Sequence, residues 1–161
     1  MTVTNTTKST ENLSLRITAE FSAAVERVWQ IWEDPRQLER WWGPPTWPAT
    51  FERYEFHPGG KADYFMTGPD GTKARGWWKF TAVAGPSSLE LDDGFADEHG
   101  SPVIEMSSAH MAVAIDNTGG GTRMSVTTTF ESAEQMEKML AMGMEEGISQ
   151  AMGQIDAILA G

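Results

Sequence analysis

The chain has 161 residues, and its 12 Lys and Arg against 23 Asp and Glu give a formal net charge of -11 at pH 7. Such an acidic protein is unsuited to a nucleic acid or an anionic membrane, because phosphate binding needs concentrated Lys and Arg. Cysteine is absent, which excludes disulfides, thiolate metal ligands and cysteine nucleophiles and is typical of a cytoplasmic protein. No apolar run is long enough to span a membrane.

The length suits a single domain with one hydrophobic core, which we place at residues 13–161. Residues 1–12 are rich in Ser and Thr and lack an apolar core of signal-peptide length. We predict that they form a disordered tail.

The first structured elements are a strand and two short helices. Residues 13–21 alternate apolar and polar side chains, which predicts a half-buried strand. Ser22 is expected to cap a helix through Trp32, and Asp34 to cap a second one. The second helix ends in Trp41-Trp42-Gly43-Pro44-Pro45. Two interpretations of these indoles are open: they form a lid over a pocket, or they complete the core.

Six further strands are predicted between residues 51 and 131, separated by Gly- and Pro-rich turns: 51–56, 61–67, 72–83, 89–91, 103–116 and 122–131. Residues 92–98 are predicted to be an acidic loop. The inner face is expected to carry Trp78, Phe80, Met111, Val113, Ile115, Met124, Val126 and Phe130. Thr128 shares this face, either as a core hydroxyl or as a cavity contact.

Residues 132–161 are predicted to form one long amphipathic helix that begins at a Ser132–Gln135 capping box. Gly143, Gly147 and Ala151 recur every four residues on its apolar face, although a glycine inside a helix costs roughly 1 kcal/mol relative to alanine. Either this stripe allows close packing on the sheet, or it forms the floor of a ligand cavity with methionines as adaptable walls. The element order predicts an α+β fold in which a curved antiparallel sheet grips the terminal helix.

Several motifs and their order resemble one known family: Val25-Glu26-Arg27-Val28-Trp29, Trp41-Trp42, Pro58-Gly59-Gly60, Gly68-Pro69-Asp70-Gly71, Gly119-Gly120-Gly121-Thr122-Arg123 and the closing helix. They resemble the activator of heat-shock protein 90 ATPase homologue-like family, in the START-like (SRPBCC), helix-grip superfamily. The resemblance implies a seven-stranded antiparallel sheet around the terminal helix, with two short helices closing one end of an internal cavity. The chain departs at Gly147-Ile148, where small bacterial members often have Gly-Trp.

Residues that carry catalytic or metal chemistry are sparse. His57, His99 and His110 lack metal-ligand spacing and are read as surface residues, with His110 pointing outward, so no metal and no cofactor is predicted. Strand carboxylates are read as solvated. The Gln154 amide shares the helical line of the glycines and needs a partner, which a ligand or a strand group would supply. Tyr64 is the matching polar candidate from the sheet.

The first hypothesis is a protein that binds a small apolar or aromatic molecule between the sheet and the terminal helix. An enzyme of the cyclase or hydrolase kind, using the same cavity, is the second. An interaction protein that stimulates a chaperone ATPase in the stress response is the third, and a homodimer is compatible with each. The expected cavity residues are Trp41, Trp42, Tyr64, Met66, Trp78, Phe80, Met111, Val113, Thr128, Met139, Gly143, Gly147 and Gln154.

Overall fold

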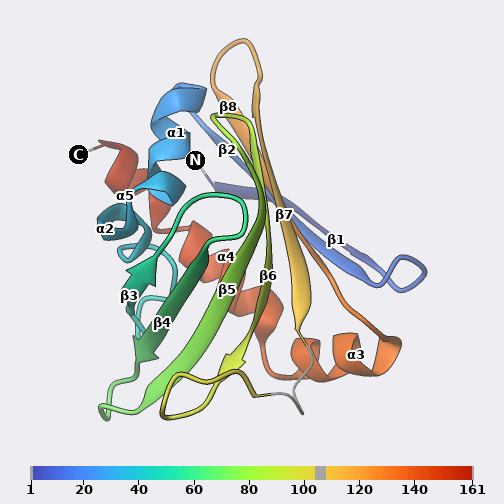
Figure 1. The fold of residues 1–161 in the computed structure, drawn as a ribbon. Coiled ribbons are helices and arrows are strands. Elements are labelled where there is room, and N and C mark those ends of the chain that lie inside the picture. Colours follow the sequence, from blue (N-terminus) through green and yellow to red (C-terminus); the bar gives the residue numbers. More distant parts are fainter. Residues whose placement is uncertain (1, 104–107, 161) are drawn as a thin grey trace.

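The computed structural model describes residues 2–103 and 108–160. Within this part of the chain, eight antiparallel strands form one sheet with the spatial order β1-β2-β8-β7-β6-β5-β4-β3, accompanied by five helices (Figure 1). The strands are β1 (Thr2–Ser9), β2 (Ser14–Phe21), β3 (Ala49–Tyr54), β4 (Lys61–Thr67), β5 (Lys73–Ala84), β6 (Ser88–Ala96), β7 (Ala109–Asn117) and β8 (Thr122–Thr129). The helices are α1 (Val25–Glu33), α2 (Pro35–Leu38), α3 (Ala133–Ala141), α4 (Met144–Met152) and α5 (Ile155–Ala160). The predicted α+β class with a single antiparallel sheet is confirmed.

Strand β1 accounts for the difference from the predicted seven strands, because it occupies residues expected to be a disordered tail. That expectation is wrong for residues 2–9, which pair antiparallel with β2 so that Thr6 faces Ile17 and Lys8 faces Leu15. Threonine is β-branched and fits a strand, and the backbone pairing needs no apolar alternation along β1. Lys8 also forms a 2.9 Å ion pair with Glu145 of α4.

Strands β6 and β7 differ from their predicted bounds. Strand β6 continues through the segment predicted to be an acidic loop, so that Asp93 and Phe95 stay in phase with the buried Leu91. The loop prediction is therefore wrong for residues 92–96. Strand β7 begins at Ala109 instead of residue 103, and residues 104–107 of the predicted strand lie outside the described residues. The buried face of β7 and β8 is the predicted one, including Thr128, which is 1% exposed.

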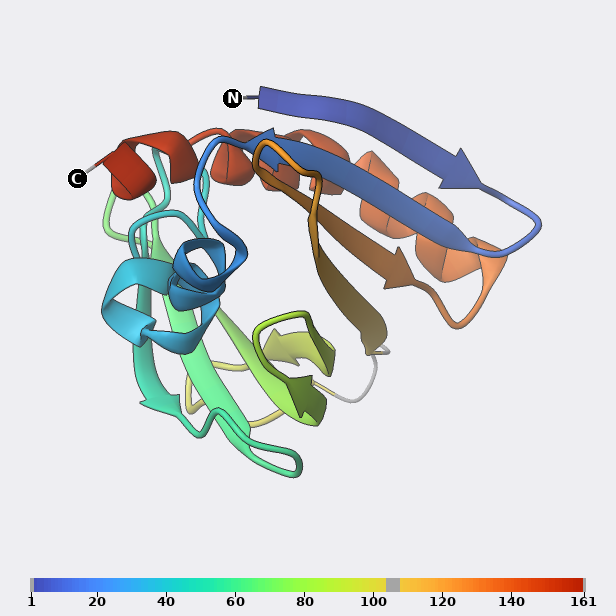
Figure 2. The same cartoon turned by 90° about the horizontal axis from the view of Figure 1, so that it is seen from above.

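The sheet is strongly curved. Seen from above it forms an open half-ring, with α3 and α4 running along the side made by β1 and β2 (Figure 2). Helix α1 lies inside the curve and packs against β7. It begins after Ala24 and has no side-chain cap, so the predicted Ser22 cap is wrong. The predicted Asp34 cap of α2 is confirmed, since its carboxylate accepts the backbone N–H of Arg36 at 2.9 Å.

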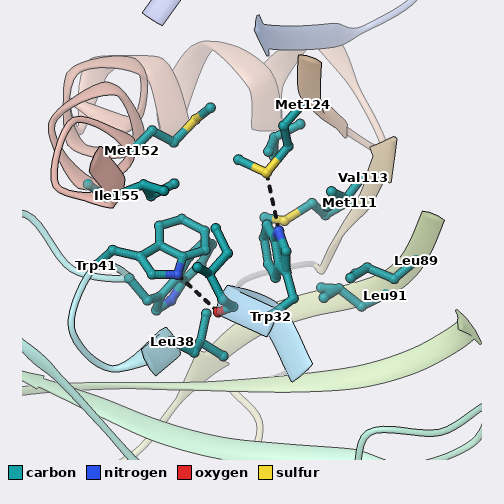
Figure 3. Packing of buried hydrophobic residues seen from close by; sticks show 14 of the residues in the cluster. Trp32, Leu38, Trp41, Leu89, Leu91, Met111, Val113, Met124, Met152 and Ile155 are labelled. Atoms are coloured by element: carbon teal, nitrogen blue, oxygen red, sulfur yellow. Dashed lines mark hydrogen bonds between the residues drawn. The ribbon is translucent and has the colours of Figure 1, made fainter. Parts of the chain in front are cut away.

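The core lies between α1, the inner face of the sheet and the C-terminal helices (Figure 3). Trp32 is fully buried at its centre, and its Nε1 donates to the sulfur of Met124 at 3.2 Å. Trp41 packs edge-on against it with ring centroids 4.9 Å apart, and its Nε1 donates to the carbonyl of Ile31 at 3.1 Å. These bonds satisfy two indole donors that burial would otherwise leave without a partner.

The C-terminal segment is three helices in succession, not the single long helix predicted. The Ser132 cap is confirmed, because its hydroxyl accepts the N–H of Gln135 at 3.1 Å. Helix α3 ends before Gly143, which adopts the left-handed conformation with φ 86° and starts α4, and Gly153 separates α4 from α5. Glycine reaches this conformation without the steric cost that a side chain would impose. Gly143 therefore interrupts the helix, a role that the sequence interpretation did not assign to it.

Candidate functional site

Two adjoining pockets lie between the α3–α4 junction and the inner face of the sheet. The outer pocket has a volume of ≈ 290 Å³ and an almost entirely apolar lining: Trp42, Pro44, Met66, Phe95, Met139, Met142, Gly143, Met144, Gly147, Ile148 and Ala151. The inner pocket has a volume of ≈ 160 Å³ and is lined by Trp42, Tyr64, Asp93, Gly94, Phe95, Ala109, Met111, Met139, Met144 and Ile148. We treat them as the two ends of one candidate site, because they share Trp42, Phe95, Met139, Met144 and Ile148.

The outer pocket owes its shape to the helix break. Gly143 turns the chain between α3 and α4, which places methionines of both helices around the opening, and Met142 is 57% exposed there. A Cβ added at Gly147 would meet no atom within 4 Å, so this glycine leaves open space in the pocket wall. Unbranched methionine side chains adapt to irregular shapes. This end of the site is suited to apolar molecules.

Tyr64 provides the first polar group of the inner pocket. It faces Gly76 on the neighbouring strand β5, and a Cβ on that glycine would lie 2.5 Å from the Tyr64 hydroxyl oxygen. The phenol therefore extends across β5 toward β6, and it can do so only because residue 76 has no side chain. Phe51 stacks on the Tyr64 ring at a centroid distance of 5.0 Å and helps to fix its direction.

Two indoles lie behind the phenol. Trp42 and Trp78 are 6% and 0% exposed, and their rings meet edge-on with centroids 4.8 Å apart. Both Nε1 atoms are buried and have no hydrogen-bond partner among the described residues. Burial and the nearby Asp93 charge raise the pKa of Tyr64. The two indole N–H groups lie close enough to its oxygen to lower the pKa in part, although neither reaches hydrogen-bond geometry. A polar group without a partner in such a place is a feature of functional sites.

Asp93 lies on β6 near Tyr64 and the two indoles. In the sheet it is paired with Trp78 of β5 on one side and with Ala109 of β7 on the other. Asp93 is half-buried, and burial raises the pKa of its carboxyl group to about 7, with a further contribution from the negative charge of Asp92. The Ala109 backbone N–H and His110 act in the opposite direction. Asp93 therefore changes its charge near neutral pH, which is typical of residues that bind or transfer a proton.

His110 lies on the other face of the sheet, as predicted. Its Nδ1 is 2.9 Å from Asp92 and its Nε2 is 2.8 Å from Glu90. Desolvation lowers the pKa of His110, but the hydrogen bonds and charges of these two carboxylates outweigh it and raise the pKa above its usual value. Across residues 2–103 and 108–160, no three or more His, Asp or Glu side chains are grouped in a way that could hold a metal ion.

The structure brings some of the predicted cavity residues together and leaves others in the core. Trp42, Tyr64, Met66, Met111, Met139, Gly143 and Gly147 line the two pockets. Trp78 lies directly behind them, against Trp42. The remaining buried candidates, Trp41, Phe80, Val113 and Thr128, line neither pocket.

Gln154 also lies away from the pockets. Its Nε2 donates to the carbonyl of Gly43 at 2.7 Å and to that of Trp41 at 3.3 Å. The partner of this amide is thus the loop after α2, and neither a ligand nor a strand is required. The contact joins the link between α4 and α5 to the segment that carries Trp42.

Asp93 is the polar residue that the sequence interpretation missed. It was assigned to an acidic loop, although Leu89, Leu91, Asp93 and Phe95 occupy every second position of one strand. Following that period-two pattern beyond Leu91 would have placed its carboxyl group on the inner face. Met144 and Ile148 line both pockets but were not among the expected cavity residues, because the helix break that positions them was not predicted.

None of the helices in the described residues combines the length and the apolar character needed to cross a membrane.

No protein of curated function matches the chain. Two solved structures are similar over nearly their whole length. A solution NMR structure of a protein from Arthrobacter aurescens is 63% identical with a TM-score of 0.95, covering 99% of this chain and 92% of that one. A crystal structure of a protein from Mycobacterium smegmatis is 47% identical with a TM-score of 0.91, covering 98% and 96%.

A third structure, of a protein from Rhodobacter sphaeroides, is 20% identical with a TM-score of 0.83 over 97% of each chain, and it supports the fold alone. The family model described as Activator of Hsp90 ATPase homolog 1-like protein matches residues 22–160, which is most of the chain. The motifs, the fold and this match agree, and the chain belongs to the family of Activator of Hsp90 ATPase homolog 1-like proteins.

Proposed function

We propose that this protein binds a small, largely apolar molecule between the sheet and the helices α3 and α4. The observation that supports the proposal is the pair of adjoining pockets, in which apolar walls surround a few polar groups at the inner end. Ligand sites in proteins combine these features, and typical volumes begin at roughly 300 Å³. The outer pocket, at ≈ 290 Å³, is at the small end of that range and suits a compact ligand.

Filling the pocket tests the proposal. A Cβ at residue 147 would meet no atom within 4 Å, and Gly147 lines the outer pocket, so Gly147→Leu is expected to fold while its side chain takes up room for a ligand. Binding of a fluorescent hydrophobic probe should weaken by roughly tenfold or more, because a filled pocket excludes the probe's apolar surface. Gln150→Leu is the matched control, since it adds the same side chain at an exposed position of the same helix. Equal affinity in the two variants would contradict the proposal.

An enzyme that acts on a carbonyl compound is a second candidate, favoured by Tyr64 and the protonatable Asp93 at the end of an apolar pocket. Such a pair can orient a carbonyl group and exchange a proton with it. Ester and polyketide-like substrates separate the two candidates, because a carrier shows saturable binding without turnover. Turnover that disappears in Asp93→Asn would favour the enzyme.

A further inference from the structure

Hydrogen-bond donors in and directly behind the inner pocket are left unused by the protein. The indole N–H groups of Trp42 and Trp78 are buried and lack partners among the described residues, and both lie beside the Tyr64 oxygen. No described residue accepts a hydrogen bond from the Tyr64 hydroxyl, so its hydrogen is free to point into the inner pocket that Tyr64 lines. Tyr64 is thus arranged to donate to an acceptor that the protein itself does not provide.

Asp93 is the second group at the same end of the pocket. The backbone N–H of Ala109 acts on its carboxyl group, and none of the residues lining either pocket is a lysine, arginine or histidine. An ionised Asp93 would consequently lie in an apolar pocket without a cation, whereas a protonated Asp93 is a second hydrogen-bond donor. Asp93 and Tyr64 interact electrostatically, which places the two groups near each other.

We propose that the inner pocket recognises an uncharged ligand by one carbonyl or phenol oxygen, which accepts hydrogen bonds from the Tyr64 hydroxyl and from the protonated Asp93 carboxyl. The rest of the ligand lies in the apolar outer pocket. This inference rests on the proposed binding function and specifies the class of ligand. Two donors directed at one oxygen in an apolar site also discriminate strongly against a ligand that lacks the oxygen, because the donors then stay unpaired.

The inference predicts the sign of a pH effect. The titratable groups around Asp93 are Tyr64 from β4, Asp92 on its own strand and His110 from β7, while β5 contributes Trp78 and the pocket residues of α3 and α4 are uncharged. Asp93 loses its proton as the pH rises through about 7, and its carboxylate then repels the ligand oxygen. Affinity for a carbonyl ligand should therefore fall with pH, whereas affinity for an apolar cation would rise.

Three naphthalene probes of similar shape test the proposal by competition with a fluorescent hydrophobic probe: 2-acetylnaphthalene, 2-isopropenylnaphthalene and 1-(2-naphthyl)ethylamine. At about pH 5.5 the acetyl compound should bind roughly tenfold more tightly than the isopropenyl compound, which has the same shape without the oxygen. At about pH 8.5 that preference should shrink to roughly threefold or less, because one of the two donors is lost.

Two conservative variants assign the donors. Tyr64→Phe keeps the ring that stacks on Phe51, so it should bind the isopropenyl compound as wild type does and lose most of the preference for the acetyl compound. Asp93→Asn retains an N–H donor that does not titrate, so its preference for the acetyl compound should no longer depend on pH. The pH test on Asp93→Asn remains decisive if Tyr64→Phe does not fold.

Three outcomes would overturn the inference, and they leave different conclusions about the proposed function. Equal binding of the acetyl and isopropenyl compounds, with both weakened by Gly147→Leu, would refute the polar recognition and leave the apolar binding function standing. Tighter binding of the amine than of the acetyl compound at both pH values would show that Asp93 is ionised throughout and recognises a cation. Absence of binding by all three probes would refute both the polar recognition and the proposed binding function.

Discussion

Asp93→Asn is expected to stabilise the folded protein at neutral and alkaline pH and to have little effect on stability in acid. The folded state holds the Asp93 proton up to about pH 7, whereas the unfolded chain releases it near its ordinary pKa of 3.8. Between these values folding takes up a proton, so the contribution of this residue to stability falls as the pH rises. Above about pH 7 both states are ionised, and the folded state bears the full cost of a buried carboxylate.

The size of the effect follows from the two pKa values. A rise from 3.8 to about 7, at about 1.4 kcal/mol per pH unit, corresponds to roughly 4 kcal/mol. Asp93 keeps some exposed surface at the pocket, and water there reduces the penalty, so a difference of about 2–4 kcal/mol is expected. The asparagine side chain has nearly the same shape and carries no charge, so it avoids this penalty at every pH.

Urea unfolding of wild type and Asp93→Asn between about pH 4.5 and 8.5 measures the difference directly, because groups that titrate equally in both proteins cancel. Asp116→Asn is the control, since it makes the same chemical change at an exposed position of β7. The stability gain from Asp93→Asn should grow through the acidic range and level off above about pH 7. A gain that is independent of pH would refute the assignment of Asp93 as the buried, proton-binding carboxyl group.

Two further predictions concern the helix break and the indoles. Gly143→Ala should lower the free energy of unfolding by about 1 kcal/mol, because φ is 86° at this residue. Gly153→Ala, at φ -64°, is the control and should be neutral or slightly stabilising. Equal effects of the two substitutions in urea unfolding would count against the left-handed break. Trp42→Phe should remove most of the ligand-dependent change in tryptophan fluorescence, and Trp41→Phe should retain it, because only Trp42 lines the pockets. The reverse result would place the ligand elsewhere.

Period-two alternation in the sequence identified most of the sheet and its buried face. The apolar positions of residues 14–21, 109–117 and 122–129 are on the inner face because a strand directs alternate side chains to opposite sides. Local capping signals were equally informative at Asp34 and Ser132, where the cap and the capped N–H are two or three residues apart. These features depend on neighbouring residues, so the sequence alone determined them.

The tertiary structure decided the features that depend on partners far along the chain. The polar strand β1 is held by backbone pairing with β2, which its own composition does not reveal. Gly143 is compatible with a continuous helix and with a left-handed break, and the structure shows the break.

In the candidate site, too, some features follow from the sequence alone and others only from the tertiary structure. Its apolar members could be recognised from the periodicity of helix and sheet, but the grouping of Tyr64, Asp93, Trp42 and Trp78 depends on strand register across β4, β5 and β6. Gln154, in contrast, meets the loop carbonyl of Gly43, 111 residues earlier in the chain. Periodicity specifies which face of an element is buried, but only the three-dimensional register specifies which polar groups meet on that face, because each contact joins residues that no local pattern relates.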